Sequence, residues 1–267
     1  MPAEREPFQR FSCLASIFIS TYPVEKGEEM LAQIESQMVD NLLQAIGRGD
    51  YKEHGRFPSE NELAVSYDIP RINARKALLK LEDMGYIYSK QGKGRFLKPE
   101  KLQIELHLTG STSFSEKMKS AGHDLETQNL GYVKVPYDAK VYSKLRVQQA
   151  DEVFKISRLH SVNKQPIALH ISYVAKSVFP QIERDGDHIQ SMFAYYGDQG
   201  FTDFASNESH VSISFPTSVE SSLFECASLV PLLVVESDCI ETNQDNVLEY
   251  TKLIYRSDFF NYVLAAE

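Results

Sequence analysis

A cluster of basic and amide side chains near residue 70 has the composition of a nucleic-acid contact surface. Arg71, Asn73 and Arg75 are close together in the sequence, and Lys93 and Arg95 follow further along the chain. An arginine guanidinium can pair with a guanine edge or a phosphate, and an asparagine amide can read adenine. Between residues 70 and 98 there are eight basic and two acidic side chains, although the whole sequence has a net charge of −9. This local positive charge predicts a nucleic-acid-binding module, and charge alone leaves a solvated charged helix as the alternative.

A second set of candidate residues is related by an internal repeat. The segment that starts at Val135 and the segment that starts at Phe215 share one succession of apolar and polar residues. Each copy predicts a proline-led helix followed by a β-hairpin, so two copies can share one antiparallel sheet about a pseudo-twofold axis. In this alignment His170 corresponds to Glu249. We expect both side chains to face a ligand cleft between the halves. The alternative is that both lie on a hydrated face of their strands.

Three helices and a hairpin are predicted to position the basic cluster. Apolar residues recur at helical spacing over residues 28–46. Ser59 and Glu62 then form the capping-box pattern of a short second helix, whose first turn is able to hold a phosphate. A third helix is predicted over residues 71–84, and two β-prone runs over 86–97 flank a glycine-rich turn. This order is that of a winged helix-turn-helix.

In a winged helix-turn-helix, the third helix enters the major groove of DNA. Its first residues, here Arg71, Asn73 and Arg75, are presented to base edges. The hairpin lies beside the sugar-phosphate backbone, so Lys93 and Arg95 are expected to contact phosphates.

Composition excludes several other classes of protein. The 267 residues allow one large domain or two modest ones. The longest apolar runs are shorter than the ~18 residues that a membrane-spanning helix needs. Cys13, Cys226 and Cys239 are too few and too widely spaced for a disulfide framework or a structural zinc site, which favours a reducing compartment. Residues 11–19 weakly resemble a signal peptide, but acidic residues precede them, so we expect a strand or an ordered extension there.

Three motifs of the first module occur in a characteristic order and spacing. They are FPSENELA at residues 57–64, PRINARKAL at 70–78 and QGKGRF at 91–96. With these motifs the module resembles the DNA-binding domain of GntR-type bacterial transcription regulators. The resemblance implies DNA contacts at Arg71, Asn73, Arg75, Gln91 and Gly92. Asn61 and Pro70 depart from the residues usual in the family. These departures affect which operator sequence is expected, but DNA binding itself is still expected.

The remainder of the chain is predicted to be mainly β. Six alternating or apolar runs suit strands, at residues 130–135, 153–160, 167–174, 210–215, 232–241 and 248–255. The motifs RLH at 158–160, ALHISYV at 168–174 and LEYTKLIYRSDF at 248–259 resemble the UTRA ligand-sensing domain of the HutC subfamily, whose fold is like that of chorismate lyase. The expected fold is therefore α+β. Its parts are an N-terminal extension (1–27), a winged helix-turn-helix (28–101), a linker (102–112) and an antiparallel-sheet UTRA domain (113–267).

The UTRA resemblance implies a site for a small anion such as a phosphate, phosphonate or carboxylate. The positions implied are Ser115, Arg158, His160, His170, Ser191, Glu249 and Tyr255. Arg158 can hold an anion bidentately. His160 stands where the family usually has a second arginine and His170 where it usually has a glutamate, which disfavours an aminosugar phosphate. The histidines could also bind a metal, although the sequence shows no third donor. We expect Arg158→Ala to leave folding intact, and in that variant we expect His160 to gain a proton and partly replace the lost charge as the pH falls toward 6.

These features predict a ligand-responsive transcription regulator, a repressor that a small anionic metabolite releases from its operator. The expected partners are a two-fold symmetric DNA site and a second copy of the chain, with no cofactor, no catalytic residue, no membrane and a cytoplasmic location. Two alternatives remain open. One is a lyase-like enzyme in which Arg158, Arg256 and Glu249 bind and protonate a carboxylate substrate. The other is an architectural DNA-binding protein with a structural second domain.

Overall fold

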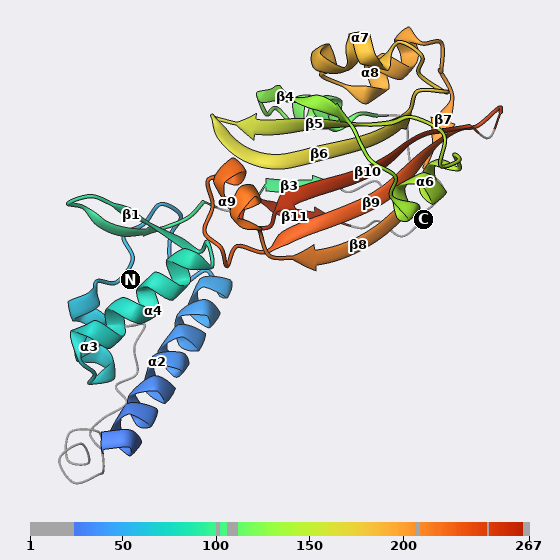
Figure 1. The fold of residues 1–267 in the computed structure, drawn as a ribbon. Helices are drawn as coiled ribbons and strands as arrows, with labels where there is room; N and C mark the ends of the chain where they lie inside the picture. Colours follow the sequence, from blue (N-terminus) through green and yellow to red (C-terminus); the bar gives the residue numbers. More distant parts are fainter. Residues whose placement is uncertain (1–23, 100–101, 106–111, 207–208, 245, 264–267) are drawn as a thin grey trace. The chain divides into compact units, whose positions relative to one another are not determined.

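The computed structural model describes residues 24–99, 102–105, 112–206, 209–244 and 246–263. The chain divides into two compact units that separate near residue 100, the second containing nearly all of the remaining residues (Figure 1). Within the described ranges, every helix is too short or too polar to cross a membrane.

The first unit contains three helices followed by a hairpin, the order expected for a winged helix-turn-helix. Its elements are α2 (Val24–Gly47), α3 (Glu60–Tyr67), α4 (Arg71–Asp83), β1 (Ile87–Lys90) and β2 (Gly94–Leu97). The strands β1 and β2 pair antiparallel. Helix α2 begins before residue 28 and so includes the end of the expected extension. The rest of that extension, with the strand expected at 11–19, lies outside the described residues.

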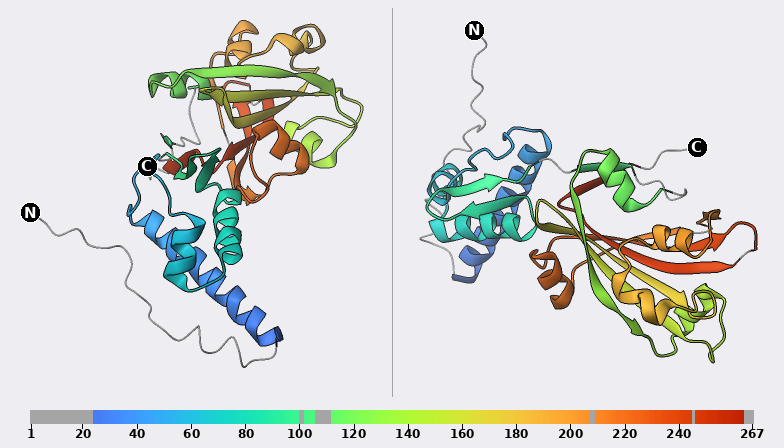
Figure 2. Two further views of the ribbon diagram at one scale, coloured as in Figure 1. Left: turned by 90° about the vertical axis from the view of Figure 1, so that its left-hand side faces the viewer. Right: turned by 90° about the horizontal axis from the view of Figure 1, so that it is seen from above.

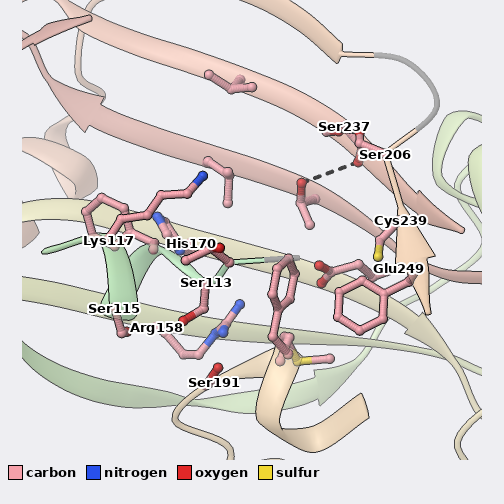
Figure 3. A pocket seen from close by; sticks show the side chains of 18 of the residues that line it. Ser113, Ser115, Lys117, Arg158, His170, Ser191, Ser206, Ser237, Cys239 and Glu249 are labelled. Carbon is pink, nitrogen blue, oxygen red and sulfur yellow. Dashed lines mark hydrogen bonds between the residues drawn. The ribbon is translucent and has the colours of Figure 1, made fainter. Parts of the chain in front are cut away.

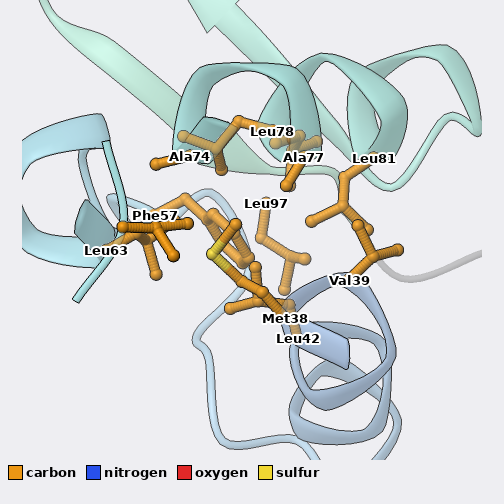
Figure 4. Close-up of a cluster of buried hydrophobic side chains, with 12 residues drawn as sticks. Met38, Val39, Leu42, Phe57, Leu63, Ala74, Ala77, Leu78, Leu81 and Leu97 are labelled. Atoms are coloured by element: carbon orange, nitrogen blue, oxygen red, sulfur yellow. The ribbon is translucent and has the colours of Figure 1, made fainter. Parts of the chain in front are cut away.

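One apolar cluster holds the first unit together. The buried faces of α2, α3 and α4 meet there and are joined by Phe57 and Leu97 (Figure 4). On α4 the residues Ala74, Ala77, Leu78 and Leu81 are fully buried, because their three- and four-residue spacing places them on one side of the helix. The opposite side of α4 is thereby left exposed.

Local hydrogen bonds explain where the helix-turn-helix elements begin. The Ser59 hydroxyl accepts from the Glu62 backbone N–H at 3.2 Å, and the Glu62 carboxylate accepts from the Ser59 N–H at 2.7 Å. This confirms the predicted capping box. Pro70 precedes α4 and makes no side-chain cap. Gly92, in the turn between β1 and β2, has a φ of 72°, a left-handed conformation that glycine adopts without strain.

The second unit is built on a seven-stranded antiparallel sheet. The strand order is β4–β5–β6–β10–β9–β7, and β8 also pairs with β9. The strands are β4 (Leu125–Lys134), β5 (Val153–Val162), β6 (Gln165–Ala175), β7 (Phe204–Ala205), β8 (Ser209–Ser214), β9 (Leu232–Glu241) and β10 (Val247–Arg256). All six expected strands are present, and β4 begins earlier than expected.

The internal repeat is confirmed by the bounds of the elements. Helix α6 (Ala139–Leu145) recurs 79 residues later as α9 (Ser218–Phe224). Strand β5, at 153–162, recurs at the same interval as β9, at 232–241. Ser172 on β6 pairs directly with Thr251 on β10, and these residues are also 79 apart. A pseudo-twofold axis therefore passes between Ser172 and Thr251, at the centre of the sheet.

The two faces of the sheet are covered by different helices (Figures 1 and 2). Helices α6 and α9 pack on one face, in two apolar clusters with β5, β6, β9 and β10. Helices α5 (Phe114–Ser120), α7 (Ile182–Asp185) and α8 (Met192–Asp198) pack on the other face, and the short 3-10 helix η1 (Gly186–His188) joins α7 to α8. Apolar clusters under α5 and under α7–α8 lie on this second face, where the cavity described below is found.

Part of the expected linker is a strand. Residues Leu102–Glu105 form β3, which pairs in parallel with β11 (Phe260–Val263). Leu102–Glu105 alternate apolar and polar residues, which is a strand pattern that the linker prediction overlooked, and the partner strand lies near the end of the chain.

Candidate functional site

An exposed basic surface is formed by the start of α4 and the tip of the hairpin. The Arg71 side chain is 67% exposed, and Arg75, one turn further along α4, is also exposed. The three residues of the β1–β2 turn, Gln91, Gly92 and Lys93, are exposed as well. These five positions are among those where the sequence predicted DNA contacts, and the structure leaves all five accessible.

Asn73 differs from the expectation. It is only 8% exposed, and its amide nitrogen lies 3.4 Å from a carboxylate oxygen of Glu35 on α2. Two residues along a helix turn the side chain by about 200°, so Asn73 faces away from Arg71 and Arg75. The structure therefore gives Asn73 a contact between α2 and α4, and an adenine contact, which stays a prediction, would require its side chain to leave Glu35.

Arg95 and Ser59 also have partners within the first unit, and only those of Arg95 were not expected from the sequence. The Arg95 side chain is only 16% exposed and pairs with Glu60 at 3.2 Å and with Glu82 at 3.5 Å. Arg95 therefore connects the hairpin to the helices, and its phosphate contact stays a prediction. The Ser59 hydroxyl caps α3, and the first turn of α3 carries two carboxylates, Glu60 and Glu62, which oppose a phosphate there.

The second unit contains a cavity of about 170 Å³ on the sheet face that carries α5 and α8 (Figure 3). All seven residues implied by the UTRA resemblance line it: Ser115, Arg158, His160, His170, Ser191, Glu249 and Tyr255. They come from α5, the three strands β5, β6 and β10, and the residue before α8. The fold thus gathers in one place residues that are up to 140 positions apart in the sequence.

Arg158 and Glu249 are charged groups removed from water. Their exposed fractions are 5% and 3%. One terminal amino group of Arg158 donates to the Ser172 hydroxyl at 2.7 Å, while its Nε and one carboxylate oxygen of Glu249 have no hydrogen-bond partner among the described residues. Burial lowers the pKa of Arg158 and raises the pKa of Glu249, and the attraction between the two charges opposes both shifts. The cavity therefore offers an unsatisfied donor and an unsatisfied acceptor.

His160 and His170 lie against each other beside Arg158. Their ring centroids are 4.3 Å apart, and the Phe114 ring packs edge-on against both. The Thr127 hydroxyl is 2.9 Å from His160 Nδ1, whereas Nε2 of each histidine has no partner in the described part of the chain.

Both histidines are neutral near physiological pH. Burial, reinforced by the nearby charge of Arg158, lowers the pKa of His160 to about 3. Burial also lowers the pKa of His170 well below its ordinary value. Because burial is the larger cause, it also opposes the protonation expected of His160 near pH 6 in Arg158→Ala. In the described ranges, no group of three His, Cys, Asp or Glu side chains is arranged to hold a metal ion.

Strand β4 holds the segment that brings Ser191 to the cavity. The Asn129 amide donates to the carbonyl oxygens of Gly186 and Ile189, at 2.9 and 2.8 Å. Gly186 is required here, because a Cβ atom would lie 2.6 Å from the Tyr132 ring. Ser191 then caps α8, accepting from the Ala194 N–H at 3.3 Å.

Several cavity residues were missed in the sequence, and the internal repeat contained the signal for two of them. An interval of 79 residues relates the candidates Arg158 and His160 to Ser237 and Cys239, whereas Thr251 corresponds to Ser172, which was not a candidate. Ser237, Cys239 and Thr251 all line the cavity. Ser206 and Ser209, which meet Ser237, had no such signal because the repeat is irregular around β7 and β8.

Arg256 does not belong to this site. It is 5% exposed, and it bonds to the Asp258 carboxylate and to the carbonyl oxygens of Pro166 and Phe224. It is also absent from the residues that line the cavity. The substrate contact expected of Arg256 in the enzyme hypothesis was therefore wrong.

The fold and the two sites define a class of protein, a ligand-responsive DNA-binding transcription regulator. The family model for bacterial regulatory proteins of the gntR family matches residues 34–97, and the model for the UTRA domain matches residues 120–261. The UTRA match alone spans more than half of the chain. The chain therefore belongs to the GntR family of transcription regulators and carries a UTRA domain.

Named repressors are among the similar proteins. The mannosyl-D-glycerate transport/metabolism system repressor MngR of Escherichia coli (strain K12) is 23% identical over 231 residues, 86% of this chain and 95% of that protein. The HTH-type transcriptional repressor NagR of Bacillus subtilis (strain 168) is 25% identical over 228 residues, 85% of this chain and 92% of that protein. The crystal structure of PhnF from Mycobacterium smegmatis has the same fold, with a TM-score of 0.55 and 20% identity over 89% of this chain and 99% of that one.

Proposed function

We propose that this regulator is a repressor that leaves its operator when a small anionic metabolite binds the cavity of the second unit. The observation that carries the proposal is Arg158, a buried guanidinium with an unpartnered N–H in a cavity of about 170 Å³. A phosphate, phosphonate or carboxylate would satisfy that donor, and charge-assisted hydrogen bonds are strong where water is excluded. The similarity to MngR and NagR supports repression as the direction of regulation.

The neutral histidines narrow the class of anion. With His160 and His170 uncharged, Arg158 is opposed by Glu249, and the two other charged side chains that line the cavity, Lys117 and Asp238, are also of opposite sign. A multiply charged anion would be poorly compensated there. A singly charged group fits better when its body can donate a hydrogen bond to Glu249 and match the donor or acceptor role that the tautomer gives each Nε2 atom.

The effector acts by favouring one conformational state. It shifts the equilibrium only as far as it binds the released state better than the DNA-bound state. We further propose that the chain works as a homodimer on a two-fold symmetric operator, because paired recognition helices match half-sites about one helical turn apart. The proposal places the protein in the HutC subfamily and in the cytoplasm, where the chromosome is.

A titration of operator binding against candidate anions tests this function. Inorganic phosphate, methylphosphonate and small carboxylates are added to the complex of full-length protein with operator DNA, and thermal melting of the protein is followed in parallel. We expect one class to release the DNA and to raise the melting temperature. As a control, Arg184→Gln removes one positive charge from an exposed side chain of the same unit, and this variant should respond to the anions like wild type. If none of these anions releases the DNA or raises the melting temperature, the proposal is contradicted.

We propose binding without catalysis as the role of the cavity. The lyase-like alternative needs a second arginine for the substrate, and Arg256 is committed to Asp258 and two carbonyl groups. Incubation with chorismate and assay of pyruvate tests the alternative directly. Turnover would overturn the proposal.

A further inference from the structure

Glu60, at the first position of α3, lies between two arginines of the DNA-binding unit. One carboxylate oxygen accepts from Arg71 Nε at 2.9 Å, and the other accepts from a terminal amino group of Arg95 at 3.2 Å. The Glu60 side chain is 15% exposed. Its partial burial would raise its pKa, but the hydrogen bonds from Arg71 and Arg95 outweigh burial and lower the pKa, so Glu60 is ionised at neutral pH.

The two arginines on Glu60 differ in what they can still do. Arg95 is 16% exposed and also pairs with Glu82, so it is held inside the unit. Arg71 is 67% exposed, and its bond to Glu60 uses Nε alone. Among the described residues, neither terminal amino group of Arg71 forms a hydrogen bond or an ion pair. A bidentate contact to a guanine edge requires two such donors in a fixed plane.

The support behind Glu60 is continuous. Arg95 links Glu60 to Glu82 near the end of α4, and the Glu82 carboxylate accepts from both the N–H and the hydroxyl of Ser89 on β1, at 2.9 and 3.0 Å. Glu60 is therefore attached to the hairpin and to the far end of the recognition helix. A carboxylate held in this way can orient the guanidinium that it binds.

We propose that Glu60 is a positioning residue that orients Arg71 for base readout and sets the preference for operator over random DNA. The proposal rests on the proposed contact of Arg71 with DNA. Orientation before binding spares the rotamer loss that a free arginine would undergo on the DNA. The negative charge of Glu60 also weakens attraction to any phosphate backbone, which lowers affinity for operator and random DNA alike. The orientation of Arg71 therefore raises the ratio of operator to random affinity, and the charge by itself leaves that ratio nearly unchanged.

The test compares Glu60→Gln with Glu62→Gln in the full-length protein. Both residues lie in the first turn of α3, and each change removes one negative charge. The Glu62 side chain hydrogen-bonds to the Ser59 backbone in the capping box, and glutamine can form the same bond. Affinities for operator and for random duplex are measured at several salt concentrations. We expect Glu60→Gln to lower the affinity ratio by about tenfold, the effect of one well-placed base contact. Glu62→Gln should change the ratio by less than about twofold. Equal ratios in the two variants would overturn the proposal.

A shorter carboxylate separates orientation from charge. Glu60→Asp keeps the charge but withdraws it from Arg71, so the ratio should fall as in Glu60→Gln while affinity for random DNA stays at the wild-type value. A ratio that follows charge alone, with Glu60→Asp like wild type, would overturn the positioning role. Melting temperatures confirm that each variant is folded.

An Arg71→Ala background distinguishes failure of this inference from failure of the DNA contact itself. Once Arg71 is absent, Glu60→Gln should no longer change the ratio, because there is no guanidinium left to orient. A ratio that falls equally in both backgrounds would assign the effect to Arg95 and overturn the proposal. If Arg71→Ala leaves operator affinity unchanged, the contact proposed for Arg71 has failed, whatever Glu60 does.

Discussion

Two arginines show how differently the two units use positive charge. Arg71 in the first unit is 67% exposed and bonds to a carboxylate at the surface, whereas Arg158 in the second unit is 5% exposed and faces a buried carboxylate. Water and salt screen the first charge strongly and the second hardly at all. The first unit is therefore suited to a polyanion that is recognised in solvent, and the second to a small group that must leave water completely.

The difference also determines what each arginine contributes to stability. An exposed ion pair contributes little to folding, so the DNA-binding surface can change without loss of structure. Arg158 and Glu249 are buried together, and removal of either one leaves the other charge uncompensated. The sequence-based expectation that Arg158 is dispensable for folding does not agree with this burial.

The largest effect is expected from Arg158→Ala, which removes the buried one of the two arginines compared. The substitution should abolish the response to the effector and destabilise the second unit by about 3–5 kcal/mol, because Glu249 is left buried and unpaired. Urea unfolding followed by circular dichroism measures the loss. The double variant Arg158→Met with Glu249→Gln should recover part of the stability without recovering the response. A loss below about 1 kcal/mol in the single variant would show that the two charges are not coupled.

The next effect concerns pH and the two buried histidines. The pKa of His160 is lowered from 6.5 to about 3, so the unfolded chain binds a proton that the folded chain refuses. Stability is therefore complete above pH 6.5 and falls as the pH decreases from 6.5 toward 3. From pH 7 to pH 5 the loss should be about 2 kcal/mol from His160, and His170 adds to it in the same direction. Urea unfolding at these pH values, with His170→Phe as the comparison, measures it. If the unfolding free energy depends on pH in His170→Phe as it does in wild type, His170 does not contribute to that dependence and this explanation is contradicted.

A comparable effect, confined to the first unit, is expected from Arg75→Ala. This exposed side chain is placed for a base contact, so operator affinity should fall by about 1–3 kcal/mol and the preference at one base position per half-site should relax. Binding assays on operator variants measure both quantities. An equal loss on operator and random DNA would show that Arg75 contacts only the backbone.

The smallest effect is expected from Lys93→Ala at the tip of the hairpin. Loss of one phosphate contact should weaken binding to all sequences alike and reduce the slope of log affinity against log salt by about 1. Effector binding to the second unit should keep the same weak salt dependence in wild type and variant. A change in base preference would assign Lys93 to sequence readout instead.

Much of the first unit was predictable because its signals are local. The Ser59–Glu62 capping box and the periodicity of α4 depend on residues three or four apart, and both appear in the structure as expected. The internal repeat extended this reach, because two copies of one pattern must fold alike. It predicted the paired hairpins of the sheet and contained the positions of Ser237 and Cys239.

Tertiary structure decided whether a polar side chain was available or already occupied. Asn73 and Arg95 have the residue types of DNA ligands, but Glu35, Glu60 and Glu82, all distant in the sequence, bind them inside the unit. The charge state of the histidines was likewise set by burial under α5 and by the neighbouring Arg158. The sequence by itself determined the order of the elements and the repeat, because these follow from patterns along the chain, and its resemblance to UTRA domains indicated seven of the residues that line the cavity. Burial, ion pairing and pKa depend on neighbours brought together only by folding, and the tertiary structure alone decided them.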